Sequence, residues 1–482
     1  MDTFARDRLP PREQWPRLHF DLPELRYPAR LNCATVLLDD AIAEGHGDRP
    51  AILTDAGPVS YRELLARANR IAGVLADLGV QPGNRVLLRG YNGVTLYAAW
   101  LAVMKAGAIA VTTMPMLRVP ELSAILAKGR PAFALCDQRL AAELRDAAAA
   151  TGMAETVVTW GDGDLERRMA KASDRFVNAD TAADDVCLLA FTSGTTGQPK
   201  ACMHFHRDVL AMADVVARHL LRTQPTDIYA GSPPLGFTFG LGALLVFPLR
   251  FRAATVPIEA PSPATILAAI EKHRVTCLFT APIAYRGLAG EVQGRDLSSL
   301  KRCVSAGEFM PKAVSDLWHE KTGIRIIDGI GATEMIHIFI SASGDEIRPG
   351  ATGRPLPGYR ACVLDEEGRE LPRGSTGRLA VTGPTGCRYL DDERQRDYVQ
   401  HGWNVTGDLY RVDEDGYFWF VARADDMIVS AGYNIAGPEV EWALLAHAAV
   451  RECAVVAAQD PERGTVVKAC VVLAPGKAAC PE

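Results

Sequence analysis

Nine consecutive residues combine the groups that bind phosphate. The apolar run Asp185–Phe191 has the pattern of a buried strand, and the segment Thr192-Ser-Gly-Thr-Thr-Gly-Gln-Pro-Lys200 follows it. Glycine lets backbone N–H groups approach phosphate oxygens, the hydroxyls add donors, and the lysine adds positive charge. We interpret the segment as a phosphate cradle, with a flexible polar turn as the alternative. Its binding residues are Thr192, Ser193, Gly194, Thr195, Thr196, Gly197 and Lys200.

The cradle is not a P-loop, because Gly197 is followed by Gln198-Pro199-Lys200 rather than by Lys and Ser or Thr. This difference excludes a P-loop kinase or ATPase.

A hydroxyl and a carboxylate stand together after a second predicted strand. Asp328-Gly-Ile-Gly-Ala-Thr-Glu334 leaves the apolar run Ile324–Ile327. Magnesium takes few protein carboxylates and completes its shell with phosphate oxygens and water. We therefore predict that Thr333 contacts a phosphate and that Glu334 is a Mg²⁺ ligand. A plain helix N-terminus is the alternative.

A third segment suits a sugar. In Thr406-Gly-Asp-Leu-Tyr410, Asp408 can accept hydrogen bonds from both ribose hydroxyls. Arg423, at the end of the next short strand, can reach the same sugar or a phosphate. A solvated turn with a surface arginine is the alternative.

Alternating helix and strand patterns must position these segments. After a proline-rich strap over residues 1–35, apolar residues at helical spacing follow Ser60, a predicted N-cap with Glu63 three positions on. Repeated helix–strand alternation predicts two α/β subdomains with mostly parallel sheets. Residues 350–424 change to short strands with turns and predict a small antiparallel barrel. One helix from Pro438 and two strands close the chain.

Composition narrows the class of protein. The chain has 482 residues, a formal net charge of -6 and a pI near 6.0, so nothing indicates a nucleic-acid or anionic-membrane partner. Its 11 cysteines include no CxxC pair, which argues against a disulfide framework or a zinc site. No signal peptide and no apolar run of about 18 residues is present, so we expect a cytoplasmic enzyme. Whether it forms a homodimer stays open.

In this order, the segments resemble the adenylate-forming superfamily of acyl-CoA synthetases, luciferases and nonribosomal-peptide adenylation domains. The resemblance covers nearly the whole chain. It includes Ser305-Ala-Gly-Glu308, similar to the superfamily's adenine-side loop, and the stretch 423–434, similar to its hinge and thioester-side loop. It implies an adenylation domain over 1–424, with the barrel at about 350–424, and an α+β C-terminal domain over 425–482 of which only part is present.

The resemblance implies a two-step reaction with ATP, Mg²⁺ and coenzyme A. A substrate carboxylate attacks the ATP α-phosphorus and expels pyrophosphate, and a thiolate then attacks the acyl-adenylate. Lys200 with Thr195 and Thr196 would meet the β- and γ-phosphates. Thr333 would meet the α-phosphate and Glu334 the Mg²⁺. Further implied roles are adenine contacts by Gly307, Glu308, Asp328, Gly329, Ile330 and Gly331, ribose contacts by Asp408 and Arg423, a hinge at Asp425 and a pantetheine tunnel at Gly432.

One departure narrows the subfamily. Ile330 stands where many relatives have tyrosine, and the run from Gly331 to Phe339 resembles benzoate-type aryl-CoA ligases. That branch implies an aryl pocket in which His337 contacts the carboxylate. For Phe237 and Phe239, the alternative is that they pack in the core. The N-terminal stretch 9–25 resembles 2-aminobenzoate CoA ligases, and Thr238 is predicted to accept from the ortho-amino group. The pocket residues are Phe237, Thr238, Phe239, His337 and Ile338.

The superfamily's C-terminal catalytic lysine is not found, because Lys477 stands in a different kind of turn. We therefore expect weak adenylation and weaker thioesterification from this chain. The alternatives are activation of another acid, loading of a carrier protein, and a nucleotide-binding pseudoenzyme.

Overall fold

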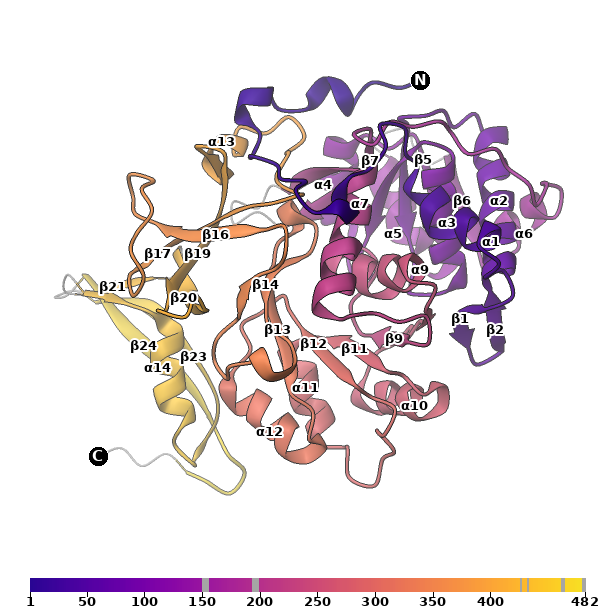
Figure 1. The fold of residues 1–482 in the computed structure, drawn as a ribbon. Helices are drawn as coiled ribbons and strands as arrows, with labels where there is room; N and C mark the ends of the chain where they lie inside the picture. The colour runs from indigo at the N-terminus through magenta and orange to yellow at the C-terminus, as the bar shows by residue number, and fades with distance from the viewer. Residues whose placement is uncertain (150–155, 193–198, 425–426, 431–432, 461–463, 479–482) are drawn as a thin grey trace.

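The computed structural model describes residues 1–149, 156–192, 199–424, 427–430, 433–460 and 464–478 (Figure 1). Two large sheets stand side by side with helices between and around them, and a smaller antiparallel sheet follows in orange. The helices are α1 (Asp40–Ala43), α2 (Tyr61–Asp77), α3 (Val94–Lys105), α4 (Val119–Gly129), α5 (Ala141–Ala149), α6 (Asp164–Met169), α7 (His206–Met212), α8 (Thr238–Leu241), α9 (Phe247–Arg250), α10 (Pro263–His273), α11 (Pro282–Ala289), α12 (Lys312–Thr322), α13 (Gln395–Tyr398) and α14 (Gly437–Leu445).

The larger sheet has nine strands in the order β15-β14-β13-β12-β11-β9-β10-β1-β2. The six strands from β13 to β1 run parallel, and the strands at both edges are antiparallel. The bounds are β1 (Pro50–Thr54), β2 (Gly57–Ser60), β9 (Ile228–Gly231), β10 (Ala254–Val256), β11 (Cys277–Thr280), β12 (Arg302–Ser305), β13 (Ile326–Gly331), β14 (Ile338–Ser341) and β15 (Arg354–Pro355).

The second sheet has six strands in the order β6-β5-β3-β4-β7-β8 and is parallel except for the edge strand β8. Burial explains why its strands read as continuous apolar runs, since every residue of β3 and β4 is buried. The bounds are β3 (Arg85–Arg89), β4 (Ile109–Thr113), β5 (Phe133–Asp137), β6 (Val157–Trp160), β7 (Val186–Thr192) and β8 (Lys200–Phe205).

The antiparallel region pairs in the order β16-β17-β19-β18, with β20 also on β19. Two antiparallel hairpins and α14 complete the fold beside it, in yellow in Figure 1. The bounds are β16 (Arg360–Leu364), β17 (Thr376–Thr382), β18 (Val399–Gln400), β19 (Trp403–Val412), β20 (Phe418–Arg423), β21 (Ile428–Ser430), β22 (Tyr433–Ile435), β23 (Val450–Asp460) and β24 (Gly464–Leu473).

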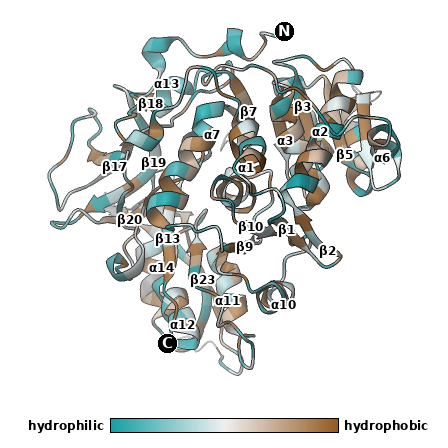
Figure 2. Cartoon of the chain, turned by 45° about the vertical axis from the view of Figure 1, so that its right-hand side comes forward, coloured by the Kyte–Doolittle hydropathy of each residue, from teal (hydrophilic) through white to brown (hydrophobic). Residues whose placement is uncertain are grey.

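Apolar packing joins these layers. One cluster fills the space between the two large sheets with α2, α3 and the π-helical turns η4 (Thr35–Asp39), η7 (Ala213–Leu220) and η8 (Gly242–Val246). Smaller clusters lie under α4 and α5 and under α10, α11 and α12. Figure 2 shows hydrophobic brown on the inner strands and teal on outer helices such as α6. Among the residues described, no helix has the length and apolar character that a bilayer crossing requires.

The predicted α/β architecture with mostly parallel sheets is confirmed, and local signals act as expected. Ser60 caps α2 by accepting from the Glu63 backbone N–H, while the Glu63 carboxylate accepts from the Ser60 backbone, a complete capping box. Before the helix that contains η4, the strap of residues 1–35 holds short 3₁₀ turns and two isolated β-bridges, Leu18 with Gly383 and Arg30 with Ala182.

Candidate active site

The predicted phosphate cradle connects β7 to β8, at the edge of the six-stranded sheet. Thr192 and Lys200 are the last paired residues of this hairpin. The residues between them that were assigned to phosphate contact, Ser193, Gly194, Thr195, Thr196 and Gly197, lie outside the described residues. The two ends of the segment nevertheless place its charged residue, Lys200, at the start of β8.

A tyrosine lies between Lys200 and the predicted magnesium ligand, Glu334. The Lys200 Nζ is 5.2 Å from the centroid of the Tyr389 ring, and the Tyr389 hydroxyl donates a hydrogen bond to Glu334 Oε1. Glu334 is buried in the 3₁₀ turn η9 (Thr333–Met335), between β13 and β14. A lysine, a tyrosine hydroxyl and a carboxylate from three distant segments therefore converge. Tyr389 was not predicted, because it stands in no recognised motif.

The donor set at Glu334 fits magnesium. Because one carboxylate oxygen accepts the Tyr389 hydrogen bond, the other can serve a hard cation together with phosphate oxygens. Glu334 and the hydroxyl of Thr333 stand next to each other in η9, so the phosphate and the metal would approach the same turn.

His204 ties β8 to the same turn. Its Nε2 lies 2.8 Å from the Thr333 carbonyl oxygen, so this nitrogen carries the hydrogen and donates. Burial lowers the pKa of His204 to about 4, which keeps the imidazole neutral at neutral pH. His204 and His206 are both buried. His204 positions the backbone of η9 relative to the cradle strand β8.

A buried ion pair, Arg388 with Asp208, lies next to His204. Arg388 donates to Asp208 at 2.7 Å, and both side chains are fully buried. Asp208 also accepts from the backbone N–H of Phe205 at 3.0 Å, and the Arg388 guanidinium stacks 4.0 Å from the Phe205 ring centroid. The segment carrying Arg388 and Tyr389 is thus fixed against β8.

The predicted nucleotide carboxylates gather around two tyrosines. Asp408 and Arg423 are paired opposite each other on β19 and β20, with a hydrogen bond of 3.1 Å. Burial and then the charges of Asp408 and Asp328 raise the pKa of Tyr410 well above its ordinary value. Burial, with Glu334 and Asp408 contributing, does the same for Tyr398. The Asp408 carboxylate thus contributes to the raised pKa of both tyrosines.

Asp328 is held in an unusual environment. Burial raises its pKa to about 7, against the opposing hydrogen bond from the Gly329 backbone. Its Oδ1 is buried and has no hydrogen-bond partner within the described part of the chain. An unpartnered buried acceptor is costly, so this oxygen suits a ligand N–H donor.

The remaining predicted adenine contacts lie at or just after the ends of two neighbouring parallel strands, β12 and β13. Gly329, Ile330 and Gly331 end β13, and Gly307 follows β12 at φ +93°, a backbone conformation that favours glycine. Glu308 is exposed beside it. The predicted hinge Asp425 and tunnel residue Gly432 lie outside the described residues.

The predicted acyl pocket is an aromatic cluster around His337. The His337 ring lies 5.5 Å from the Phe239 ring and 4.7 Å from the Phe247 ring, between centroids. Burial lowers the pKa of His337 to about 3, so the ring is neutral. Its Nε2 is 3.4 Å from the Phe239 carbonyl, and its Nδ1 is buried without a partner in the described part of the chain.

The other pocket residues differ in exposure. Thr238 begins α8 and is buried, and Ile338 is buried with its side chain against Gly329. Phe237 is 45% exposed, so it lies outside the apolar cluster that surrounds His337. Gly242 approaches His337 so closely that a Cβ there would lie 2.5 Å from the imidazole Cδ2. The imidazole position thus depends on a glycine in η8.

Solved structures identify the class of protein. The fold matches the anthranilate CoA ligase AuaEII in complex with anthranoyl-AMP, with a TM-score of 0.90 and 32% identity over 95% of this chain and 90% of that one. A benzoate CoA ligase from Burkholderia xenovorans LB400 matches with a TM-score of 0.85 and 29% identity, over 93% and 91%. The fold is that of adenylate-forming enzymes.

Sequence comparison gives the family. The AMP-binding enzyme family matches residues 39–388, and its C-terminal domain family matches residues 439–482. The benzoate–CoA ligase of Thauera aromatica is 33% identical over 467 residues, which cover 94% of this chain and 88% of that protein. The chain belongs to the AMP-binding enzyme family, within its aryl-acid CoA ligases, and is an ATP-dependent acid–CoA ligase.

Proposed function

We propose that this chain activates an aromatic carboxylic acid of the benzoate type, with 2-aminobenzoate as its substrate. The observation that carries this proposal is the apolar cluster of Phe239, Phe247 and neutral His337, which can pack against a flat ring. His337 follows the turn that holds Thr333 and Glu334 after one intervening residue, Ile336. The acid's carboxylate would therefore meet the ATP phosphates beside it. The likeness to an anthranilate ligase structure supports the choice of acid.

In the first step a carboxylate oxygen attacks the ATP α-phosphorus, and pyrophosphate leaves. We assign Lys200 to the β- and γ-phosphates and the Thr333 hydroxyl to the α-phosphate. Glu334 would hold Mg²⁺, which supplies charge neutralisation on the phosphates when bound. Tyr389 orients the Glu334 carboxylate, and His204 fixes the turn. In the second step the coenzyme A thiolate attacks the acyl carbon, and AMP leaves.

The adenosine would lie along β13 and β19. Asp408 accepts from the ribose hydroxyls, and Arg423 is held toward the same sugar by its hydrogen bond to Asp408. The unpartnered Asp328 Oδ1 is suited to accept from the adenine amino group. Together these groups give the nucleotide its orientation, which is the main protein contribution to phosphoryl and adenylyl transfer.

A panel of acids tests the proposed substrate. The assay follows AMP formation that depends on ATP and coenzyme A, with 2-aminobenzoate, benzoate, 4-hydroxybenzoate and hexanoate compared at equal concentration. We expect the two benzoates without a para substituent to have the highest kcat/KM, with 2-aminobenzoate first. A preference for hexanoate or longer chains would refute the aryl pocket.

Thr238 is expected to select the ortho-amino group. Thr238→Ala removes a buried hydroxyl acceptor, so the ratio of kcat/KM for 2-aminobenzoate over benzoate should fall about 10-fold, the value of one hydrogen bond. Thr238→Ser keeps the hydroxyl and should keep most of the ratio. An unchanged ratio in Thr238→Ala would exclude this residue from amino-group recognition.

Tyr389 is expected to act as a positioning residue. Tyr389→Phe removes the hydrogen bond to Glu334 but keeps the ring beside Lys200. We expect kcat for adenylation to fall about 10-fold, with a higher Mg²⁺ concentration needed for half-maximal rate, because the carboxylate loses one orienting contact. Tyr417→Phe, on a distant tyrosine that donates to the Glu346 carbonyl, is the matched control. An unchanged Mg²⁺ dependence in Tyr389→Phe would contradict the assignment.

A further inference from the structure

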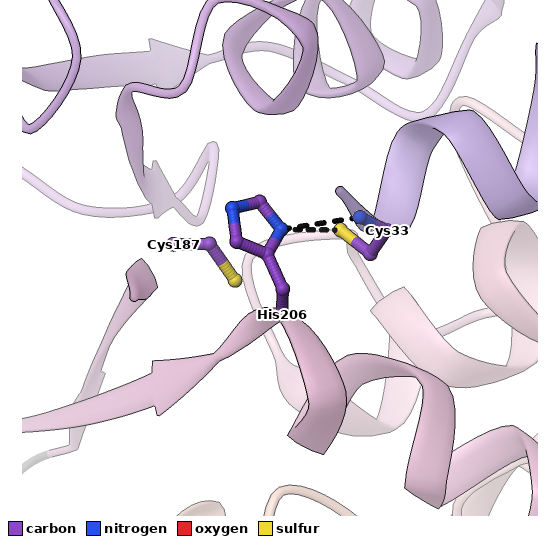
Figure 3. A group of neighbouring side chains, drawn as sticks. All are labelled: Cys33, Cys187 and His206. Carbon is purple, nitrogen blue, oxygen red and sulfur yellow. Dashed lines mark hydrogen bonds between the residues drawn. The ribbon is translucent and has the colours of Figure 1, made fainter. Parts of the chain in front are cut away.

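Two thiols and an imidazole meet in the core, away from the residues assigned to catalysis. Cys33, Cys187 and His206 place one possible metal-binding atom each within 4.8 Å of the others, and all three side chains are buried. Figure 3 shows the His206 ring between the two cysteines, with both of its dashed contacts directed at Cys33. The three residues come from separate parts of the chain: the helical turn that precedes η4, strand β7 and the first residue of α7.

The imidazole has a lone pair directed into this cluster. The backbone N–H of Cys33 donates to His206 Nδ1 at 3.2 Å, so Nδ1 is the acceptor nitrogen and the ring hydrogen is on Nε2. The Cys33 Sγ also lies 3.2 Å from Nδ1. Nδ1 therefore faces Cys33, and a metal ion bound there would replace its hydrogen bond from the Cys33 backbone N–H. A neutral imidazole is the form that binds a metal ion.

The spacing and charge of the donors favour zinc. With Zn–S at about 2.3 Å and Zn–N at about 2.0–2.1 Å, two bound donor atoms are about 3.6 Å apart, so small side-chain shifts bring the observed spacing to the bound one. Two thiolates and a neutral imidazole around a divalent ion have no net charge. A neutral complex avoids the cost of an uncompensated charge in a buried site.

We propose that Cys33, Cys187 and His206 form a zinc-binding site, with an exogenous ligand such as water in the fourth position. Binding replaces the two thiol hydrogens, which leave as two protons to solvent, and no electron is transferred. The sequence hides this site because its ligands are far apart along the chain and have no zinc-motif spacing.

The location gives the site a structural consequence. Cys187 is the second residue of β7, and His206 directly follows β8, so both lie at the base of the hairpin that carries the phosphate segment. Zinc joins this base to the N-terminal helical turn at Cys33. Bound zinc therefore holds the base of the hairpin and raises the midpoint of thermal unfolding.

Zinc binding to the full reduced chain tests the proposal. After incubation with zinc chloride and removal of the excess, we expect one zinc per chain in the unmodified protein and in Cys277→Ser, a buried thiol on β11 that serves as the control. Cys33→Ser and Cys187→Ser should each bind at least about 10-fold more weakly, the scale of losing one ligand. Equal zinc binding in these variants, or no retained zinc in the unmodified chain, would overturn the proposal.

Cobalt gives a measurement that needs no variant. Co²⁺ in the unmodified chain should show the thiolate-to-metal charge-transfer absorption of two sulfur ligands, and zinc should displace it. Absence of that absorption at saturating Co²⁺ would exclude the zinc site even if the serine variants fail to fold. The same conclusion would follow if the chain, offered zinc and copper(I) together, retained copper(I) and no zinc.

Discussion

Glu334→Gln is expected to lower kcat/KM for acyl-adenylate formation about 100- to 1000-fold, the scale of losing one electrostatic contact in a transition state. The amide keeps the shape of the side chain and can still accept from Tyr389, but it lacks the negative charge that we propose binds Mg²⁺. The measurement is pyrophosphate exchange into ATP in the presence of 2-aminobenzoate, at several Mg²⁺ concentrations.

The matched control is Glu320→Gln, on α12, where the side chain is 74% exposed. Its rate should equal that of the unmodified chain. If Glu334→Gln kept a rate within about 3-fold of the unmodified chain, below the loss of even one hydrogen bond to a charged group, the carboxylate would not be the metal ligand.

Arg388→Met is expected to lower the free energy of unfolding by about 3–5 kcal/mol, because it leaves the buried Asp208 carboxylate without its partner. Methionine retains apolar contact with the Phe205 ring, so the loss reports mainly the uncompensated charge. Urea unfolding followed by tryptophan fluorescence measures the change.

Two further variants separate charge from packing. Arg388→Met combined with Asp208→Asn removes both charges and should recover part of the lost stability. Arg369→Met breaks an exposed pair with Asp365 and should cost less than about 1 kcal/mol. If Arg388→Met lowered the free energy of unfolding no more than Arg369→Met, the buried pair would not hold the segment that carries Arg388 and Tyr389 against β8.

Local sequence signals predicted much of the scaffold. The capping box at Ser60 and the apolar run that became β7 are patterns over a few neighbouring residues, and both formed as expected. Asp408 and Arg423 were predicted to share the ribose, and the β19–β20 register does bring them opposite each other. Short-range patterns succeed here because hairpin register and helix capping depend on nearby residues.

The contacts that orient the site were not predicted. Tyr389 and Glu334 are 55 positions apart, His204 and Thr333 are 129 apart, and Arg388 and Asp208 are 180 apart. Each contact depends on how the six-stranded sheet, the nine-stranded sheet and the chain between β17 and α13 pack together. Hydrophobic periodicity and turn signals carry no information on which side chains meet across such layers.

We infer that this chain transfers AMP to an aromatic carboxylate. The most direct measurement uses 2-aminobenzoate whose carboxylate carries a heavy oxygen isotope, with ATP, Mg²⁺ and coenzyme A, followed by mass spectrometry. We expect an acyl-adenylate of 2-aminobenzoate, release of pyrophosphate, and one heavy oxygen atom in the AMP that is later released. Formation of ADP and phosphate, or AMP that carries no heavy oxygen, would contradict it.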